Sequence, residues 1–229
     1  MKIENIILVG LGGVGAQLLP MLREIQPQII HLIDHDAFET ANQQRQPLSH
    51  EYPNMHKVEA MRLHWEPFMS PIVLNPMAEL IQSISMGGLG QPDNTIVISC
   101  VDNKKARNHI RNTCIAEKFV MLTGANERYS GEAHIIYPEL VGTARDPWVQ
   151  YPTLGDEAVA ESTTPSCSVD PNPQTYAANA LTAAAMIHLL RLHSVIEFDL
   201  DPTTTIATTT KYTVGDFQTI HDYVANAET

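Results

Sequence analysis

A glycine cluster near the start of the chain restricts the possible folds more than any other feature. The residues before it, 5–10, read Asn-Ile-Ile-Leu-Val-Gly, an apolar run typical of a strand buried on both faces. The cluster, Gly10-Leu11-Gly12-Gly13-Val14-Gly15, opens a segment (13–25) whose apolar residues recur at helical spacing. Glycines at such a turn let the backbone approach a phosphate, and the helix N-terminus favours negative charge. We predict a nucleotide-binding turn, with a tight turn that binds nothing as the alternative.

Strand-like and helix-like segments alternate through the first half of the chain, which predicts a parallel, doubly wound sheet. After the first strand and helix, we expect strands at 28–34, 71–75, 95–101 and 118–123, and helices at 56–65, 77–85 and 103–117.

The pattern changes near residue 125. The expected elements are a strand at 132–137, an aperiodic stretch at 138–173, an alanine-rich helix at 174–193 and Thr-rich antiparallel strands within 195–224. We therefore predict a single α/β domain over 1–229 with a Rossmann-like, mainly parallel sheet. Its nucleotide-binding half is 1–125, and its second half, 126–229, adds antiparallel strands.

Charge and cysteine content exclude several classes of protein. With 14 Lys and Arg against 26 Asp and Glu, the net charge is −12, so nucleic acid is not the expected partner. Three cysteines without a CxxC pair favour a reducing, cytoplasmic location and exclude a four-cysteine zinc site. The apolar run 177–190 is interrupted by polar residues and is too short to span a bilayer, so no membrane association is expected.

Acidic, amide and cationic side chains follow the expected second strand. Asp34 lies at its end, about 20 residues after the glycine cluster, where an acid binds a ribose hydroxyl. The next stretch contributes an amide, an arginine and, further on, Lys57, and these groups can reach a triphosphate. A nicotinamide cofactor would give the arginine and the lysine no role.

A second acid, Asp102, follows the expected fourth strand in the sequence Cys100-Val101-Asp102-Asn103. Ligands of open α/β sheets bind at the carboxyl ends of the strands. A carboxylate that faces phosphates there is suited to Mg²⁺, which prefers carboxylates and phosphate oxygens.

Taken together, these motifs resemble the ThiF/MoeB/HesA family of adenylating proteins related to ubiquitin-activating enzymes. The resemblance covers about residues 5–193 and includes Gly124-Ala125-Asn126-Glu127-Arg128 and Pro165-Ser166-Cys167. It implies that ATP is bound by Gly10, Gly12, Gly13, Gly15, Asp34, Asp36, Asn42 and Gln46, that Arg45 and Lys57 contact phosphates, and that Asp102 holds Mg²⁺.

The resemblance also implies a reaction and partners. The C-terminal glycine carboxylate of a ubiquitin-like or sulfur-carrier protein would attack the α-phosphate of ATP and release pyrophosphate. Family members pair, so a homodimer is expected, and a conjugating enzyme is a possible later partner. Cys167 matches a cysteine that some members use to form a thioester, and the alternative is an unreactive loop cysteine.

The chain departs from the family pattern and is expected to be a short, divergent member. It begins almost directly at the first strand, so the arginine that usual members supply from an N-terminal segment is either missing or replaced by another residue; Arg23 and Arg128 are candidates by position only. Two other functions stay open. One is an NAD-dependent oxidoreductase, which predicts NADH binding. The other is a non-enzymatic partner subunit of a complete activating enzyme, which predicts ATP binding without turnover.

Overall fold

The computed structural model describes residues 2–39, 46–126, 130–154, 175–195, 207–213 and 220–223. Its strands are β1 (Asn5–Val9), β2 (Ile29–Ile33), β3 (Val73–Met77), β4 (Thr95–Ser99), β5 (Val120–Asn126), β6 (Ser130–Ile136), β7 (Ala207–Thr213) and β8 (Ile220–Tyr223). Its α-helices are α1 (Gly13–Met21), α2 (Lys57–Met69), α3 (Lys104–Glu117), α4 (Pro147–Gln150) and α5 (Tyr176–Val195).

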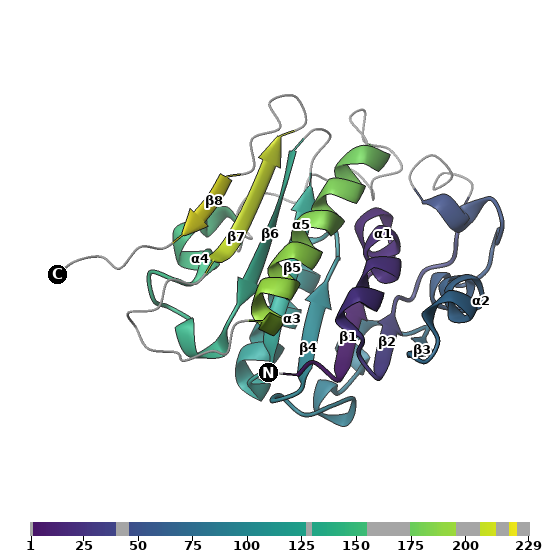
Figure 1. Cartoon of the computed structure of the whole chain (residues 1–229), viewed down its shortest axis with the longest axis horizontal. Coiled ribbons are helices and arrows are strands. Elements are labelled where there is room, and N and C mark those ends of the chain that lie inside the picture. Colours follow the sequence, from purple (N-terminus) through teal and green to yellow (C-terminus); the bar gives the residue numbers. More distant parts are fainter. Residues whose placement is uncertain are drawn as a thin grey trace.

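All eight strands form one sheet in the order β3-β2-β1-β4-β5-β6-β7-β8 (Figure 1). The pairs from β3 to β5 are parallel, and β6, β7 and β8 extend the sheet with antiparallel pairs. The predicted fold class, a mainly parallel doubly wound sheet with C-terminal antiparallel strands, is confirmed. The order reverses between β1 and β4, and ligands of open α/β sheets bind at such a switch point.

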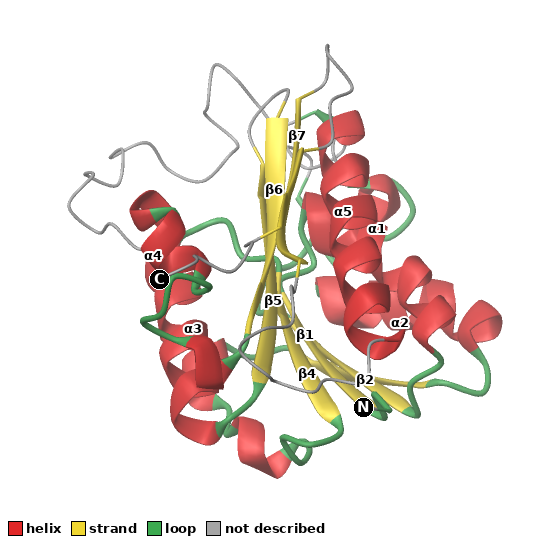
Figure 2. Ribbon diagram, turned by 60° about the vertical axis from the view of Figure 1, so that its left-hand side comes forward, coloured by secondary structure: helices red, strands yellow, loops and turns green. Residues whose placement is uncertain are grey.

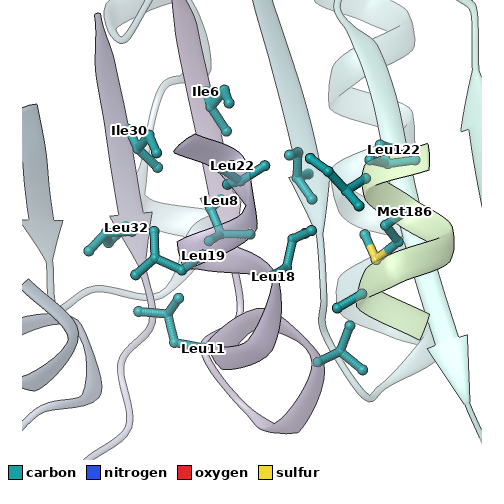
Figure 3. Packing of buried hydrophobic residues seen from close by; sticks show 14 of the residues in the cluster. Ile6, Leu8, Leu11, Leu18, Leu19, Leu22, Ile30, Leu32, Leu122 and Met186 are labelled. Atoms are coloured by element: carbon teal, nitrogen blue, oxygen red, sulfur yellow. The ribbon is translucent and has the colours of Figure 1, made fainter. Parts of the chain in front are cut away.

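Helices cover both faces of the sheet, as Figure 2 shows: α1, α2 and α5 lie on one side, and α3 and α4 on the other. Strand β1 is therefore apolar at successive positions, with Ile6 and Leu8 in one buried cluster and Ile7 and Val9 in the other. In Figure 3, leucines of α1 and of the turn after it (Leu18, Leu19, Leu22) face apolar side chains of β1 and β2. Each fully buried leucine or isoleucine contributes roughly 1.5–3 kcal/mol to folding.

Two helix predictions need correction. The segment 77–85 forms no α-helix, because Met77 continues β3 and pairs with Ile33. After it comes only a short 3₁₀ turn, Ile81–Ser83, in which the Ser83 hydroxyl donates to the Leu80 carbonyl (2.7 Å). The first helix ends at Met21 and continues to Ile25 as a 3₁₀ turn.

The described part of the aperiodic stretch is more regular than predicted. It contains a 3₁₀ turn (Pro138–Leu140) and the short helix α4, whose N-cap Asp146 accepts from the Trp148 backbone N–H (3.0 Å). Arg111 of α3 donates to the same carboxylate (2.8 Å), which fixes α4 against α3. No helix within the described ranges combines the length and apolar character needed to cross a bilayer.

Candidate nucleotide-binding site

The glycine turn lies directly after β1, and its backbone fits closely against the neighbouring strands. Gly10 has φ +89°, which L side chains rarely adopt, and a Cβ there would lie 2.8 Å from the carbonyl oxygen of Cys100. Its N–H donates to the carbonyl of Ile33 at the end of β2 (2.9 Å). The turn therefore leads the chain from β1 into α1 with no room for a side chain at its first position.

Asp34, directly after β2, fixes this turn. One carboxylate oxygen accepts from the backbone N–H of Leu11 (2.6 Å), and the other accepts from the N–H of Asp36 (2.9 Å). The residue is 9% exposed and lines the pocket. Because each carboxylate oxygen has two lone pairs, Asp34 can accept a ligand hydroxyl while both backbone hydrogen bonds persist.

A buried lysine pairs with the next acid. Lys57, the first residue of α2, donates from Nζ to a carboxylate oxygen of Asp36 (2.8 Å), and its own side chain is 7% exposed. Burial pushes the pKa of Asp36 upward, whereas the hydrogen bond and charge of Lys57, together with His35, pull it down. The net pKa of Asp36 lies below its usual value. Lys57 therefore lies at the pocket wall with its ammonium paired to the Asp36 carboxylate.

These groups line one pocket of about 470 Å³ at the carboxyl ends of β2, β1, β4 and β5. That volume is typical of small-molecule sites. Of the predicted site residues, the structure brings these to the pocket wall: Gly10, Gly12, Gly13, Asp34, Asp36, Gln46, Lys57 and Asp102.

Among the predicted residues that the structure describes, Gly15 is not part of the pocket wall. Gly15 is buried within α1 and packs against the backbone carbonyl of Gly10, so a side chain at this position would displace the turn. Asn42, Arg45 and Cys167 lie outside the described residues, as does Arg128. Arg23 is exposed in the 3₁₀ turn after α1 and is not among the residues that line the pocket.

The chain after β4 brings one acidic and one cationic side chain to the pocket, Asp102 and Arg107. Asp102 and Asn103 follow this strand, and the Asn103 side chain caps α3 by accepting from the Ala106 N–H (2.7 Å). One turn into α3, the guanidinium of Arg107 is buried at the pocket wall and donates to the Val101 carbonyl (3.1 Å). Burial lowers the pKa of Arg107, and the negative charges of Glu132 and Asp102 oppose that shift. An arginine nevertheless stays protonated, so the pocket holds a second fixed positive charge.

Cys100 also lines this pocket. Burial raises the pKa of its thiol to about 12, so it is not a thiolate nucleophile at neutral pH. Cys114 is buried within α3, and burial raises its pKa as well. Neither of these thiols is suited to covalent catalysis.

Sequence reasoning assigned no role to Arg107 or Asn179, which line the pocket, and included Asn126 only in the segment that resembles the family. Asn126 ends β5, and Asn179 lies in the first turn of α5, where the Asn126 Nδ2 donates to its Oδ1 (3.0 Å). The sequence offered one signal for Asn179, which is a polar residue inside an alanine-rich, mainly apolar run. No local pattern indicates that this part of α5 packs beside the glycine turn.

Two positions at this pocket offer carboxylates to a magnesium ion, and the hydrogen bonds already made at the first show which is better suited. Asp34, His35 and Asp36 bring ligand atoms within 4.8 Å of one another. Asp34 already accepts two backbone N–H groups, however, and Asp36 accepts the Lys57 ammonium, so this cluster is poorly suited to a cation. Asp102 fits better, because its exposed carboxylate lines the pocket and Mg²⁺ needs only one or two carboxylates besides phosphate oxygens.

Comparisons with known proteins agree with this geometry. The molybdopterin-synthase adenylyltransferase of Escherichia coli (strain K12) is 29% identical over 133 residues, 58% of this chain and 53% of that protein. The ubiquitin-like modifier-activating enzyme 5 of Caenorhabditis elegans is 28% identical over 151 residues, 62% of this chain and 36% of that protein. The chain thus matches about half or less of the length of these two relatives.

Among solved structures, that of E. coli MccB with ATP has a TM-score of 0.71 at 15% identity. The match covers 98% of this chain and 64% of that chain, and it shows a common fold. The model of the ThiF family matches residues 2–226, nearly the whole chain. This protein therefore belongs to the ThiF family.

Proposed function

We propose that this protein adenylates the C-terminal glycine carboxylate of a ubiquitin-like or sulfur-carrier protein. The observation that carries the proposal is the single pocket in which the glycine turn, Asp34, Lys57 and Asp102 meet at the switch point of the sheet. Two relatives are named as an adenylyltransferase and a ubiquitin-like modifier-activating enzyme, which supports the same reaction.

The pocket's residues support a division of roles. Asp34 accepts hydroxyls of the ribose, and the backbone of the glycine turn and the N-terminus of α1 face the phosphates. Lys57 and Arg107 offset the negative charge of the phosphates from opposite sides of the glycine turn, in a pocket where water screens the charges poorly. A magnesium ion held by Asp102 would add charge neutralisation at the phosphates.

The proposed reaction requires no covalent help from the protein. A carboxylate oxygen of the partner attacks the α-phosphorus, and the bond from that phosphorus to the bridging oxygen of the β-phosphate breaks. Pyrophosphate leaves with the bond's electron pair, and the products are the acyl-adenylate and pyrophosphate. Positioning and charge neutralisation are sufficient for such a transfer.

The oxidoreductase alternative is disfavoured because hydride transfer gives the buried Lys57 and Arg107 no function. Calorimetry separates the two: we expect binding of ATP with Mg²⁺ and no binding of NADH. The variant Asp102→Ala should weaken ATP binding, whereas Asp93→Ala, which removes an exposed acid outside the pocket, should not. NADH binding without ATP binding would favour the oxidoreductase.

Catalysis is tested by ATP–pyrophosphate exchange with candidate partners that end in glycine. We expect exchange above background with the cognate partner and none with the same partner lacking its last glycine. Exchange at background with every candidate, although ATP binds, would favour the non-enzymatic partner subunit.

Further parts of the proposal follow from the family resemblance and need separate experiments. A thioester on Cys167 predicts that Cys167→Ser loses the adduct with the partner while exchange persists. Homodimerisation is tested by sedimentation, a conjugating enzyme by transfer of the activated partner, and a cytoplasmic location by fractionation.

A further inference from the structure

The pocket extends past the nucleotide-binding groups to a pair of asparagine side chains, Asn126 and Asn179. Asn126 donates to Asn179 Oδ1 (3.0 Å), and this hydrogen bond orients the Asn179 amide. Asn179 is fully buried, and among the residues that the structure describes its Nδ2 has no hydrogen-bond partner. An unmade hydrogen bond on a buried amide destabilises the folded chain. The unpaired Asn179 N–H lies at the pocket wall, and a hydrogen bond to a ligand oxygen there would remove this destabilisation.

The position of the amide pair follows from the strand order. Asp34 follows β2, the glycine turn follows β1, Asp102 follows β4 and Asn126 ends β5, so these groups succeed one another along the sheet edge. Asn179 completes the far end, where its side chain occupies the space that a side chain at Gly13 would need. The amide pair therefore lies next to the start of α1, on the opposite side of the glycine turn from Asp34 and Lys57.

The chemistry of nucleotidyl transfer assigns this end of the pocket to the second substrate. The attacking oxygen and the leaving group lie roughly in line on opposite sides of phosphorus. Lys57 and Gln46 lie on the β2 side of the glycine turn and are suited to the leaving pyrophosphate. The attacking carboxylate then approaches from the β5 side, where Asn126 and Asn179 lie.

We propose that Asn179 Nδ2 donates a hydrogen bond to an oxygen of the carboxyl group that is adenylated, in an orientation that Asn126 fixes. This inference rests on the proposed function. A neutral amide suits the role, because it orients the carboxylate by a hydrogen bond. A cation in the same place would form a strong ion pair and make the carboxylate oxygen less nucleophilic. After the transfer, the same N–H can donate to the carbonyl oxygen of the acyl-adenylate.

The experiment compares two ligands that differ only in the acyl group. The first is N-acetylglycyl-sulfamoyladenosine, a stable mimic of a glycyl-adenylate whose amine is blocked as in a peptide. The second is sulfamoyladenosine, which lacks the acyl group. The ratio of their dissociation constants, measured by calorimetry at pH 8, isolates the acyl contacts from the nucleoside contacts.

The chosen variant is Asn179→Asp, which keeps the acceptor for Asn126 and replaces the free donor by an oxygen. We expect wild type to prefer the acyl ligand and the variant to lose about tenfold of that preference, the value of one hydrogen bond. Binding of sulfamoyladenosine should change little. Asn112→Asp makes the same change on the exposed face of α3 and should keep the wild-type ratio.

Two further variants separate the loss of the donor from the charge that Asn179→Asp adds, and test the orientation of the Asn179 amide. Asn179→Leu has a similar shape and no donor, so it should lose the preference without adding charge. Asn126→Asp removes the donor that orients Asn179, so the Asn179 amide should rotate to present its oxygen to the pocket. Thermal unfolding of each variant establishes that it is folded at the assay temperature.

The outcomes distinguish this inference from the proposed function. If wild type binds ATP but both variants at Asn179 keep the acyl preference, or lose both ligands equally, the inference is overturned and adenylation stands. An equal loss would mean that Asn179 contacts the nucleotide itself. If wild type binds neither ATP nor either sulfamoyl ligand, the proposed function fails and the inference fails with it.

Discussion

Asp34→Asn is the most informative single substitution, because Asp34 has a structural role and a proposed ligand-binding role. Its two carboxylate oxygens accept from the backbone N–H groups of Leu11 and Asp36 (2.6 and 2.9 Å). An asparagine has the same shape but only one oxygen. In the variant one of the two N–H groups must therefore face an NH₂ group, and the glycine turn loses part of its support.

The expected loss of stability can be worked from these contacts. A hydrogen bond to a charged group contributes roughly 1.5–3 kcal/mol, and a buried N–H left unpaired costs about 1–3 kcal/mol. The lost hydrogen bond and the unpaired N–H are partly the same interaction, so their energies do not simply add. We therefore expect the free energy of unfolding to fall by about 2–4 kcal/mol. The site is 9% exposed, so water compensates little of it. For a chain of this length, a loss of 2 kcal/mol lowers Tm by about 4–8 °C.

Two measurements check this prediction. Thermal unfolding followed by circular dichroism gives Tm, and calorimetry gives the ATP dissociation constant, which should rise about tenfold or more as the charged ribose acceptor is lost. Asp93→Asn, an exposed acid outside the pocket, is the matched control and should change neither value. Wild-type Tm and wild-type ATP affinity in Asp34→Asn would refute the role that we assign to this carboxylate.

Three further predictions concern the same pocket and the core. Lys57→Met should weaken ATP binding at least tenfold by calorimetry with little change in Tm, since the Asp36 carboxylate that loses its partner is half exposed and is solvated by water; unchanged affinity would exclude Lys57 as a phosphate ligand. Gly10→Ala should cost about 2 kcal/mol or more, from the positive φ and the contact with a carbonyl oxygen. Gly88→Ala, where a Cβ meets nothing within 4 Å, is its control in denaturant unfolding. Burial lowers the pKa of His193 from 6.5 to about 4, so the unfolded chain takes up its proton first as the pH falls. Stability should therefore decrease between pH 6.5 and 4 by up to about 3 kcal/mol, and His193→Gln should flatten that dependence.

The first half of the sheet was predictable because its signals are local. Strands β1, β2 and β4 are short, mainly apolar runs; Asp34 directly follows β2, and Asp102 comes three residues after the end of β4. Once the strands are parallel, their ends must meet at one edge, so the sequence also predicts that these acids share a site. The helix predicted at 77–85 was wrong because pairing with β2 decides how far β3 extends.

The sequence by itself determined the Rossmann-like fold, the glycine turn after β1 and the acid and lysine that surround it. These features depend on residues near one another in the chain and on the short-range rules of turns, helices and strands. Only the tertiary structure placed Arg107 in the pocket wall and brought Asn126 and Asn179 together beside Gly13. That end of the site exists because α5 packs on α1, β5 and β6, and the packing of surfaces far apart in sequence leaves no local pattern to detect.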